Sequence, residues 1–307
     1  MSTATAVGRL VPGEPFLEHR PMLLALAYRL LGSVHDAEDT VQDAFLRWTG
    51  ADRQNVDNPA AFLTTTVTRL ALDRLRSAAV RRETYVGPWL PEPLPTRPDD
   101  PAETAALRDS ASMAMLLLMD RLSPAERAVF VLREAFSLPY AEIAAICERS
   151  VASCRQLHHR ARLHVAASPR PPAATDPARG RALVQSFLSA ARSGELDRLK
   201  AMLREDVVYT TDGGGKANAA LRPVLGADKA ARLFASVFDR FYRTAETRLL
   251  WINHAPAVLF ERPQRHVLYV FDFDAEGRAA ELYAVINPDK LAQLLARLDD
   301  VPPLPAP

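Results

Sequence analysis

The chain has 307 residues, a formal net charge of +1 and 48% hydrophobic residues. This length predicts two or three domains, each able to bury a core. The sequence shows neither an apolar run long enough to span a bilayer nor a signal peptide, so we expect a cytoplasmic protein. Its two cysteines, Cys147 and Cys154, fall on apolar helical positions, which indicates buried free thiols rather than a disulfide or a metal site. We expect no cofactor.

Residues 1–15 are small and polar, and we expect them to be disordered. A helix is predicted from Phe16 to Gly32, where glycine ends it. A second helix, over 33–48, has one apolar face and carries its polar residues elsewhere: Asp36, Asp39, Gln42 and Asp43. Acidic residues near a first turn favour the helix dipole, and this is the simplest explanation for them.

A third helix is predicted from Asn58-Pro59, an N-cap followed by proline, to about Arg82. Its apolar residues are expected to face inward: Leu63, Val67, Leu70, Ala71 and Leu75. The opposite face is expected to carry Thr65, Thr68, Arg69, Leu72 and Arg76. We interpret residues 16–82 as one helical domain that contains an acidic helix and a basic helix.

Residues 83–100 are rich in proline, which predicts a semi-rigid extended linker. Trp89 and Leu90 are apolar and poorly suited to a passive spacer. We interpret them as a docking segment.

Residues 101–167 form a second helical domain with the pattern of a helix-turn-helix. Ser123 and Glu126 predict a capping box around Pro124. Pro139 begins a short helix, and Ser150 can cap the next one. That last helix should pack through Cys154, Leu157, Ala161 and Val165.

The other side of this last helix is basic and polar, and it carries Ser153, Arg155, Gln156, His159, Arg160 and Arg162. Arg and Gln can hydrogen-bond to base edges in a major groove, and Arg can also bind phosphate. An ordinary solvated basic face is the alternative. The order of a capped helix, a short helix, a turn and a basic helix favours DNA binding.

A short linker over 168–177 precedes a domain of α+β pattern over 178–300 and a tail over 301–307. In this domain we predict helices over 182–193, 197–203 and 228–241, strands over 207–211, 248–253, 257–261, 266–273 and 279–286, and a final helix over 291–298. Helices followed by an antiparallel meander predict an α+β cone. The fold class is therefore multidomain, with two all-α domains and one α+β domain.

Several segments resemble extracytoplasmic-function sigma factors: Asp-Ala-Glu-Asp-Thr-Val-Gln-Asp-Ala-Phe, Asn-Pro-Ala-Ala-Phe-Leu, Ala-Leu-Asp-Arg-Leu-Arg and the helix-turn-helix. They cover residues 16–166. Trp-Leu-Pro-Glu-Pro, Asp-Gly-Gly-Gly-Lys and Asn-Pro-Asp-Lys-Leu resemble the subgroup with a fused SnoaL-like domain. The resemblance implies a protein that binds core RNA polymerase and promoter DNA, with catalysis supplied by the polymerase.

The resemblance also implies roles for individual residues. The clamp helices of the polymerase β′ subunit would be bound by Asp36, Glu38, Asp39, Gln42 and Asp43. The helix over 58–76 would open the minus-ten element, with Arg69 and Arg76 on DNA, and the helix-turn-helix would recognise the minus-thirty-five element. Many members carry Asn in place of Arg69, so details of minus-ten recognition do not transfer to this chain.

Regulation of the sigma unit by the C-terminal domain is a further expectation. The linker around Trp89 would contact that domain through interdomain residues Trp89, Leu90, Pro91, Asp212, Gly213, Gly214, Gly215, Lys216, Asn287, Pro288, Asp289 and Lys290. The glycines allow close approach of the backbone, and we expect Asp212–Lys216 to be a flexible loop.

Two alternatives remain open. One is a one-component helix-turn-helix regulator with a ligand-sensing domain, which leaves the acidic helix unexplained. The other is an enzyme, because related cones hold carboxylate bases in apolar cavities. Its polar candidates are Asp206, Tyr209, Asp212, His254 and His266. A small-molecule ligand of the C-terminal domain is conceivable but has no support in the sequence.

Overall fold

The computed structural model describes residues 15–52, 56–97, 104–166, 175–263 and 265–301. The predicted disorder of the N-terminus, the predicted start of the second helical domain at 101, most of the linker over 168–177 and nearly all of the tail lie outside the described residues. Among the described helices, none combines the length and apolar character needed to cross a membrane.

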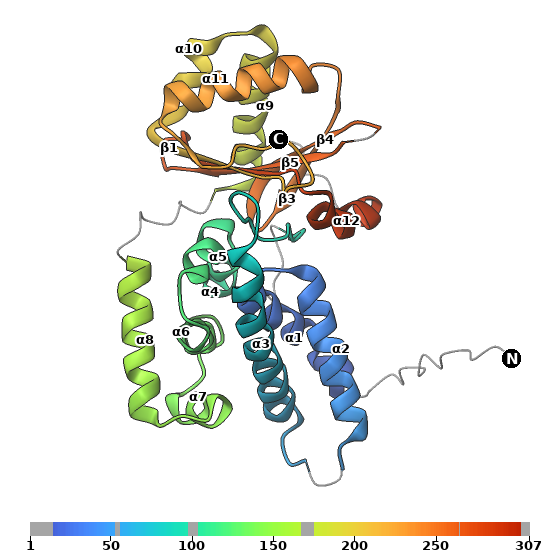
Figure 1. The fold of residues 1–307 in the computed structure, drawn as a ribbon, viewed down its shortest axis with the longest axis vertical. Coiled ribbons are helices and arrows are strands. Elements are labelled where there is room, and N and C mark those ends of the chain that lie inside the picture. The colour runs from blue at the N-terminus through green and yellow to red at the C-terminus, as the bar shows by residue number, and fades with distance from the viewer. Residues whose placement is uncertain (1–14, 53–55, 98–103, 167–174, 264, 302–307) are drawn as a thin grey trace, which may run out of the picture.

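The first part of the chain is helical (Figure 1). Three helices come first: α1 Pro15–Leu31, α2 Val34–Gly50 and α3 Pro59–Glu83. After the linker follow α4 Ala105–Ser110, α5 Met113–Asp120, α6 Pro124–Phe130 with a π-helical extension over Val131–Ala135, α7 Tyr140–Cys147 and α8 Val151–Ala166. The predicted capping box of Ser123 and Glu126 is confirmed, and Ser150 accepts a hydrogen bond from the backbone of Ser153.

The two helical units share one hydrophobic core. Because α6 and α7 pack against α3, this helix is covered on more than one side. We expected Thr68 and Leu72 to face away from the core, and this was wrong: Thr68 is 0% and Leu72 8% exposed. Both predictions considered the first unit alone, whereas α6 and α7 of the second unit also pack against α3.

The C-terminal part is a mixed α+β domain. Its helices are α9 Pro177–Ser193, α10 Leu196–Ala201, α11 Ala227–Val237 and α12 Pro288–Ala296. Its strands are β1 Leu203–Asp212, β2 Val224–Leu225, β3 Glu246–Ile252, β4 Ala255–Glu261, β5 Val267–Phe273 and β6 Ala279–Val285. The sheet order is β2-β1-β6-β5-β4-β3. The predicted antiparallel meander is confirmed for β3–β6, but β1 pairs in parallel with β6, and β2 was not predicted.

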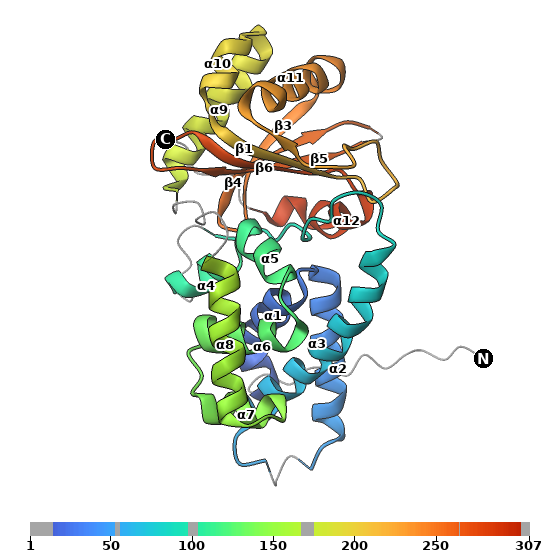
Figure 2. The same cartoon turned by 60° about the vertical axis from the view of Figure 1, so that its left-hand side comes forward.

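Both faces of this sheet are buried. The helices α9, α10 and α11 cover the face distant from the helical part, over an aromatic core that includes Phe187, Phe234 and Tyr269 (Figures 1 and 2). The opposite face packs against α12 and against Leu90 and Met113 from the preceding parts of the chain. The linker and α12 therefore lie where the sheet meets the helical part.

Candidate nucleic-acid interface and interdomain contacts

Helix α8 presents the basic side predicted from the sequence. Arg155, Gln156, His159, Arg160 and Arg162 are exposed, and Ser153 is half-buried. The packing face is confirmed, since Cys154, Leu157 and Ala161 are buried and Val165 is partly buried against the core. The Arg155 guanidinium lies 5.7 Å from the ring centre of Tyr140, whereas the Arg160 Nε lies 3.3 Å from Glu126. Arg155, with its neighbour Gln156, is thus exposed and not bound to a carboxylate among the described residues.

A buried histidine, which was not predicted from the sequence, fixes the orientation of α8. His158 Nδ1 lies 2.8 Å from the Tyr140 hydroxyl, and its Nε2 lies 2.7 Å from the Glu134 carboxylate. These contacts tie α8 to the π-helical extension and to the start of α7. The turn between α7 and α8 places Glu148 at φ 53, in the left-handed region.

The predicted DNA-binding residue Arg69 contacts the second helical unit. Its Nε and one terminal nitrogen donate to the carbonyls of Ile146 and Ala145, each at 3.2 Å. Its other terminal nitrogen lies 3.0 Å from the Glu148 carboxylate. Carbonyls at a helix C-terminus attract cations, so the end of α7 is a favourable site for this guanidinium. Arg76 is exposed and pairs with Asp73, three positions before it in the same helix, at 3.0 Å.

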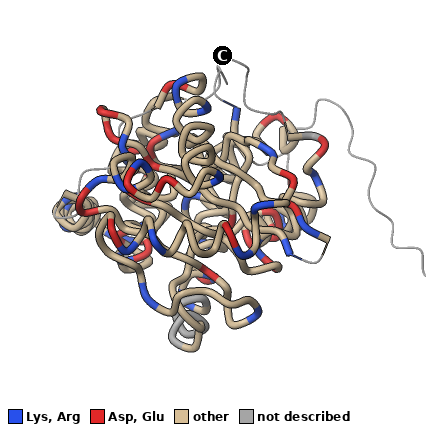
Figure 3. Tube along the Cα trace, turned by 90° about the horizontal axis from the view of Figure 1, so that it is seen from above, with Lys and Arg blue, Asp and Glu red and all other residues tan. Residues whose placement is uncertain are grey.

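The acidic residues of α2 form ion pairs with two arginines from other parts of the chain. Arg74 of α3 lies 2.7 Å from Asp43 and 3.7 Å from both Asp36 and Asp39. Glu38 instead binds Arg297, which follows α12, at 2.8 Å. Gln42 is exposed. Acidic and basic positions are interspersed along the coloured parts of the trace in Figure 3.

A buried cluster joins the linker to the α+β domain; we call Tyr85, Leu90, Asp212, Asn287 and Lys290 the Asp212 cluster. The Asp212 carboxylate accepts hydrogen bonds from the Tyr85 hydroxyl at 2.6 Å and from the Leu90 backbone at 2.8 Å. Lys290 Nζ donates to the same carboxylate at 2.6 Å and to the Leu90 carbonyl. The Asn287 amide donates to the Tyr85 hydroxyl at 2.9 Å. The expectation of a flexible loop at Asp212 was wrong, because this residue ends β1 and is 0% exposed.

The glycine loop after Asp212 lies against the same cluster. A Cβ on Gly214 would approach the Asn287 amide to 2.2 Å and the Tyr85 hydroxyl to 2.8 Å, and one on Gly215 would contact Val86. A Cβ on Gly213 would meet the Ala217 carbonyl within the loop itself. The close backbone approach expected of these glycines is thus present.

The remaining interdomain residues surround the cluster. Pro91 is buried in the linker, and the indole of Trp89 lies 4.4 Å from Lys290 Nζ. Pro288 is the first residue of α12, and Asp289 pairs with Lys216 at the surface.

Two further residues, neither of them predicted from the sequence, attach the linker to other parts of the chain: Glu92, which belongs to the linker, and Asn253. Glu92 accepts hydrogen bonds from the Ser33 hydroxyl at 2.9 Å and the His35 backbone at 3.0 Å, so it lies at the N-terminus of α2. Asn253 lies in the β3–β4 turn. Its amide donates to the Tyr28 hydroxyl and the Ala111 carbonyl, each at 2.7 Å, and its oxygen accepts from the Leu94 backbone at 3.0 Å.

Besides Asp212, two further candidates for an enzymatic base have structural partners. Tyr209 is buried with its hydroxyl 2.9 Å from that of Tyr269, and Asp206 accepts two hydrogen bonds from Arg204.

The Asp212 cluster generates a stability prediction. Replacing Lys290 by Met leaves the Asp212 carboxylate buried without its cation, and removing one partner of a buried pair costs about 3–5 kcal/mol. We expect urea unfolding, followed by tryptophan fluorescence, to show this loss. Lys216→Met is the matched control: its ion pair joins side chains that are 56% and 61% exposed, and it should cost at most about 1 kcal/mol. Equal losses in the two variants would contradict the buried-pair explanation.

Comparisons with known proteins agree with the division into two helical units. Residues 16–81 match the family described as Sigma-70 region 2, and residues 112–165 match Sigma-70, region 4. The chain is 44% identical over 225 residues to the ECF RNA polymerase sigma factor SigJ of Mycobacterium tuberculosis, covering 72% of each chain. It is 32% identical over 294 residues to the probable ECF RNA polymerase sigma factor SigI of the same species, covering 91% of this chain and 94% of that one.

The fold of the chain is also similar to that of a solved sigma factor structure. The crystal structure of the Mycobacterium tuberculosis extracytoplasmic function sigma factor SigJ superimposes with a TM-score of 0.71 at 35% identity, covering 90% of this chain and 97% of that chain. Because it covers 90% of this chain, this similarity extends into the C-terminal α+β domain. The chain therefore belongs to the extracytoplasmic-function RNA polymerase sigma factors, which direct promoter-specific transcription initiation.

Proposed function

We propose that this sigma factor contacts promoter DNA through α8 and α3 and polymerase through α2, and that its C-terminal domain regulates both contacts in cis. One observation carries the proposal: residues predicted to bind DNA or polymerase are occupied by contacts within the chain. Arg69 binds the end of α7, and Glu38 binds Arg297. We call this arrangement, in which the chain itself occupies these residues, the closed arrangement.

Release of these contacts would make both residues available. An ion pair between partly exposed side chains contributes at most about 1 kcal/mol, so polymerase or DNA can replace it. The C-terminal domain nevertheless needs little intrinsic affinity for the sigma unit, because a tethered domain has an effective concentration on the order of millimolar. The Asp212 cluster and the linker would set the balance between closed and open arrangements.

For DNA recognition, we propose that Arg155 and Gln156 contact base edges, with Ser153 and His159 beside them. Arg155→Ala should cost about 1–3 kcal/mol of discrimination at one base pair. The measurement is binding of polymerase holoenzyme to a panel of promoter duplexes with single substitutions, with a random duplex as control. Equal weakening on promoter and random duplexes would show that Arg155 binds phosphate only.

For polymerase binding, we propose that α2 contacts the clamp helices of the β′ subunit. Reversing Asp39 and Asp43 to Lys places two cations beside Arg74 and removes the carboxylates, so core binding in a pull-down should be lost while circular dichroism stays that of a folded protein. Glu18→Lys reverses an exposed charge on α1 and is the control. Unchanged core affinity of the double variant would exclude α2 as the interface.

For regulation, Gly214→Ala should loosen the closed arrangement, because its methyl group would collide with Asn287. Gly194→Ala is the matched control: both glycines have positive φ, but a Cβ on Gly194 would meet nothing within 4 Å. Strain of about 1 kcal/mol at the Asp212 cluster corresponds to a roughly fivefold change in an equilibrium constant. We expect transcript yield in vitro at limiting core polymerase to rise by about this factor for Gly214→Ala.

Trp89→Ala and removal of residues 178–307 should also change the transcript yield. If these two forms, Gly214→Ala and the full-length protein all give the same yield across a titration of core polymerase, the C-terminal domain is not a regulator.

A further inference from the structure

A cleft opens next to the Asp212 cluster, on the side of the glycine loop. It has a volume of about 410 Å³ and lies between the loop after Gly214, the start of β5 and helix α12. We call it the α12 cleft; it is lined by Gly215, Lys216, Ala217, Asn218, Arg265, His266, Ile286, Pro288, Leu291 and Leu295. It is therefore built from the segments that carry the interdomain contacts.

The polar lining of the α12 cleft is cationic. Lys216 and Arg265 line it together with His266, and none of the described lining residues is acidic. The Arg265 guanidinium is fixed in place, since one of its nitrogens donates to the Asn218 carbonyl at 3.0 Å and it lies 5.4 Å from the ring centre of Phe241. Its Nε is buried and has no hydrogen-bond partner among the described residues.

Lys216 is available to a ligand at little cost. Its partner Asp289 is 61% exposed, and ion pairs between exposed side chains contribute little to stability. An anion in the cleft could therefore bind Lys216 in place of Asp289.

The rest of the lining is apolar and comes mainly from Ile286, Leu291 and Leu295. Small-molecule sites commonly combine an apolar wall with a few charged groups that fix the orientation of the ligand. Hydrogen bonds between arginine or lysine and a carboxylate or phosphate are among the stronger ones in proteins. The matching ligand has an anionic head and a short apolar body.

We propose that the α12 cleft binds a small organic anion, a carboxylate or a phosphate ester with a short apolar body, and that its binding alters the stability of the Asp212 cluster. The coupling has a direct physical route. Lys216 follows Gly214 and Gly215, which pack on Asn287 and Val86, and Pro288 and Leu291 flank Lys290 in α12. A ligand that binds both segments changes their separation. This second part rests on the regulatory role proposed above; the first part does not.

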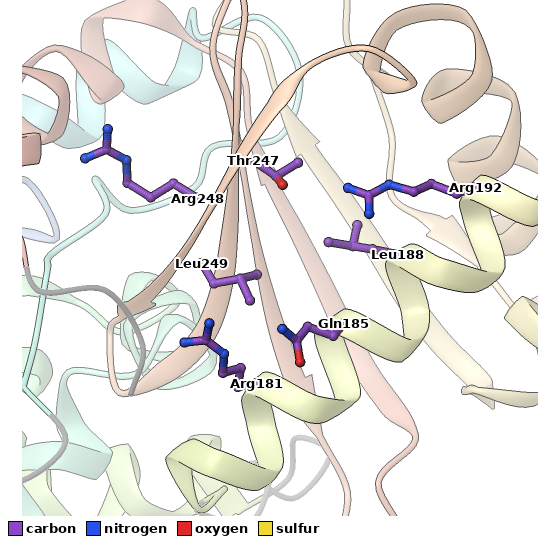
Figure 4. A pocket seen from close by; sticks show the side chains of 7 residues that line it. All are labelled: Arg181, Gln185, Leu188, Arg192, Thr247, Arg248 and Leu249. Carbon is purple, nitrogen blue, oxygen red and sulfur yellow. The ribbon is translucent and has the colours of Figure 1, made fainter. Parts of the chain in front are cut away.

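A second cationic cleft, of about 540 Å³, provides a control (Figure 4). It lies between α9 and β3, and its lining contains no residue of the Asp212 cluster. Arg181 and Arg192 extend from α9 toward β3, whereas Arg248 points away from α9 and binds Glu261. Arg192→Ala thus removes an exposed positive charge from the same domain without changing the α12 cleft.

The test uses the full-length protein and isothermal titration calorimetry with three probes: hexanoate, hexyl phosphate and neutral hexanol. We expect saturable binding of at least one anion and no saturable binding of hexanol. Lys216→Ala, Arg265→Ala and the milder Arg265→Lys should each weaken binding, the alanine variants by at least about tenfold. Arg192→Ala should leave the affinity unchanged. If neither anion binds saturably, or if the alanine variants bind as tightly as the wild type, the site does not exist. The stronger of the two anions identifies the head group.

The coupling is tested separately through thermodynamic reciprocity. If ligand and cluster are linked, Gly214→Ala must shift the affinity of the bound probe, because two coupled equilibria change each other by the same factor. Gly194→Ala should not shift it. Equal probe affinity in wild type and Gly214→Ala would overturn the coupling while leaving the binding site in place. Neither result depends on transcription, so a failure of the regulatory proposal would be distinguished by its own assay.

Discussion

Asp212 and Lys290 are an acid and a base withdrawn from water at the point where the linker meets the α+β domain. Their mutual attraction compensates for lost hydration only if hydrogen bonds satisfy the remaining polar atoms. Tyr85 and Leu90 provide these bonds, and both belong to the linker. If the linker left this position, the two charges would lose those partners. The buried pair therefore makes docking of the linker a condition for the folded state of this region.

Other contacts between units are of the same kind: a buried polar side chain of one unit forms hydrogen bonds with polar groups of another. Arg29 is 1% exposed and donates to the Leu107 carbonyl at 2.7 Å and the Ser110 hydroxyl at 2.8 Å. Arg127, also 1% exposed, donates to the Arg29 carbonyl at 3.3 Å. Such groups are costly when their partners are lost. These hydrogen bonds therefore favour one relative position of the units, whereas apolar contacts alone would be compatible with several.

The contacts that involve the proposed DNA-binding and polymerase-binding residues are of a different kind. Arg69 with Glu148 and Glu38 with Arg297 involve partly exposed side chains, so each contributes little and can be exchanged for a contact with DNA or polymerase. The molecule thus combines two kinds of contact. Buried hydrogen bonds define how the units are positioned, and exposed ion pairs lie on the proposed binding surfaces. The α12 cleft adds a place where a small molecule could shift the balance between the two. This combination fits the regulatory role that we propose for the C-terminal domain, which would keep its buried contacts while the exposed ion pairs are exchanged.

The strands β1 and β3–β6, the capping box at Ser123 and the resemblance to the sigma family could be recognised from the sequence, because caps, turns and hydrophobic periodicity act over a few residues. The two-residue strand β2 was too short for such a pattern. Trp89 and Leu90 were correctly singled out, since apolar residues in a proline-rich spacer need a partner. The burial of Thr68 and Leu72, the position of Asp212 inside the protein and the three-way contacts of Asn253 were decided only by the tertiary structure. These features join units separated by up to 225 positions in the chain. Local patterns show which face of an element is apolar, but only packing decides what covers its other face and which polar groups lose water there.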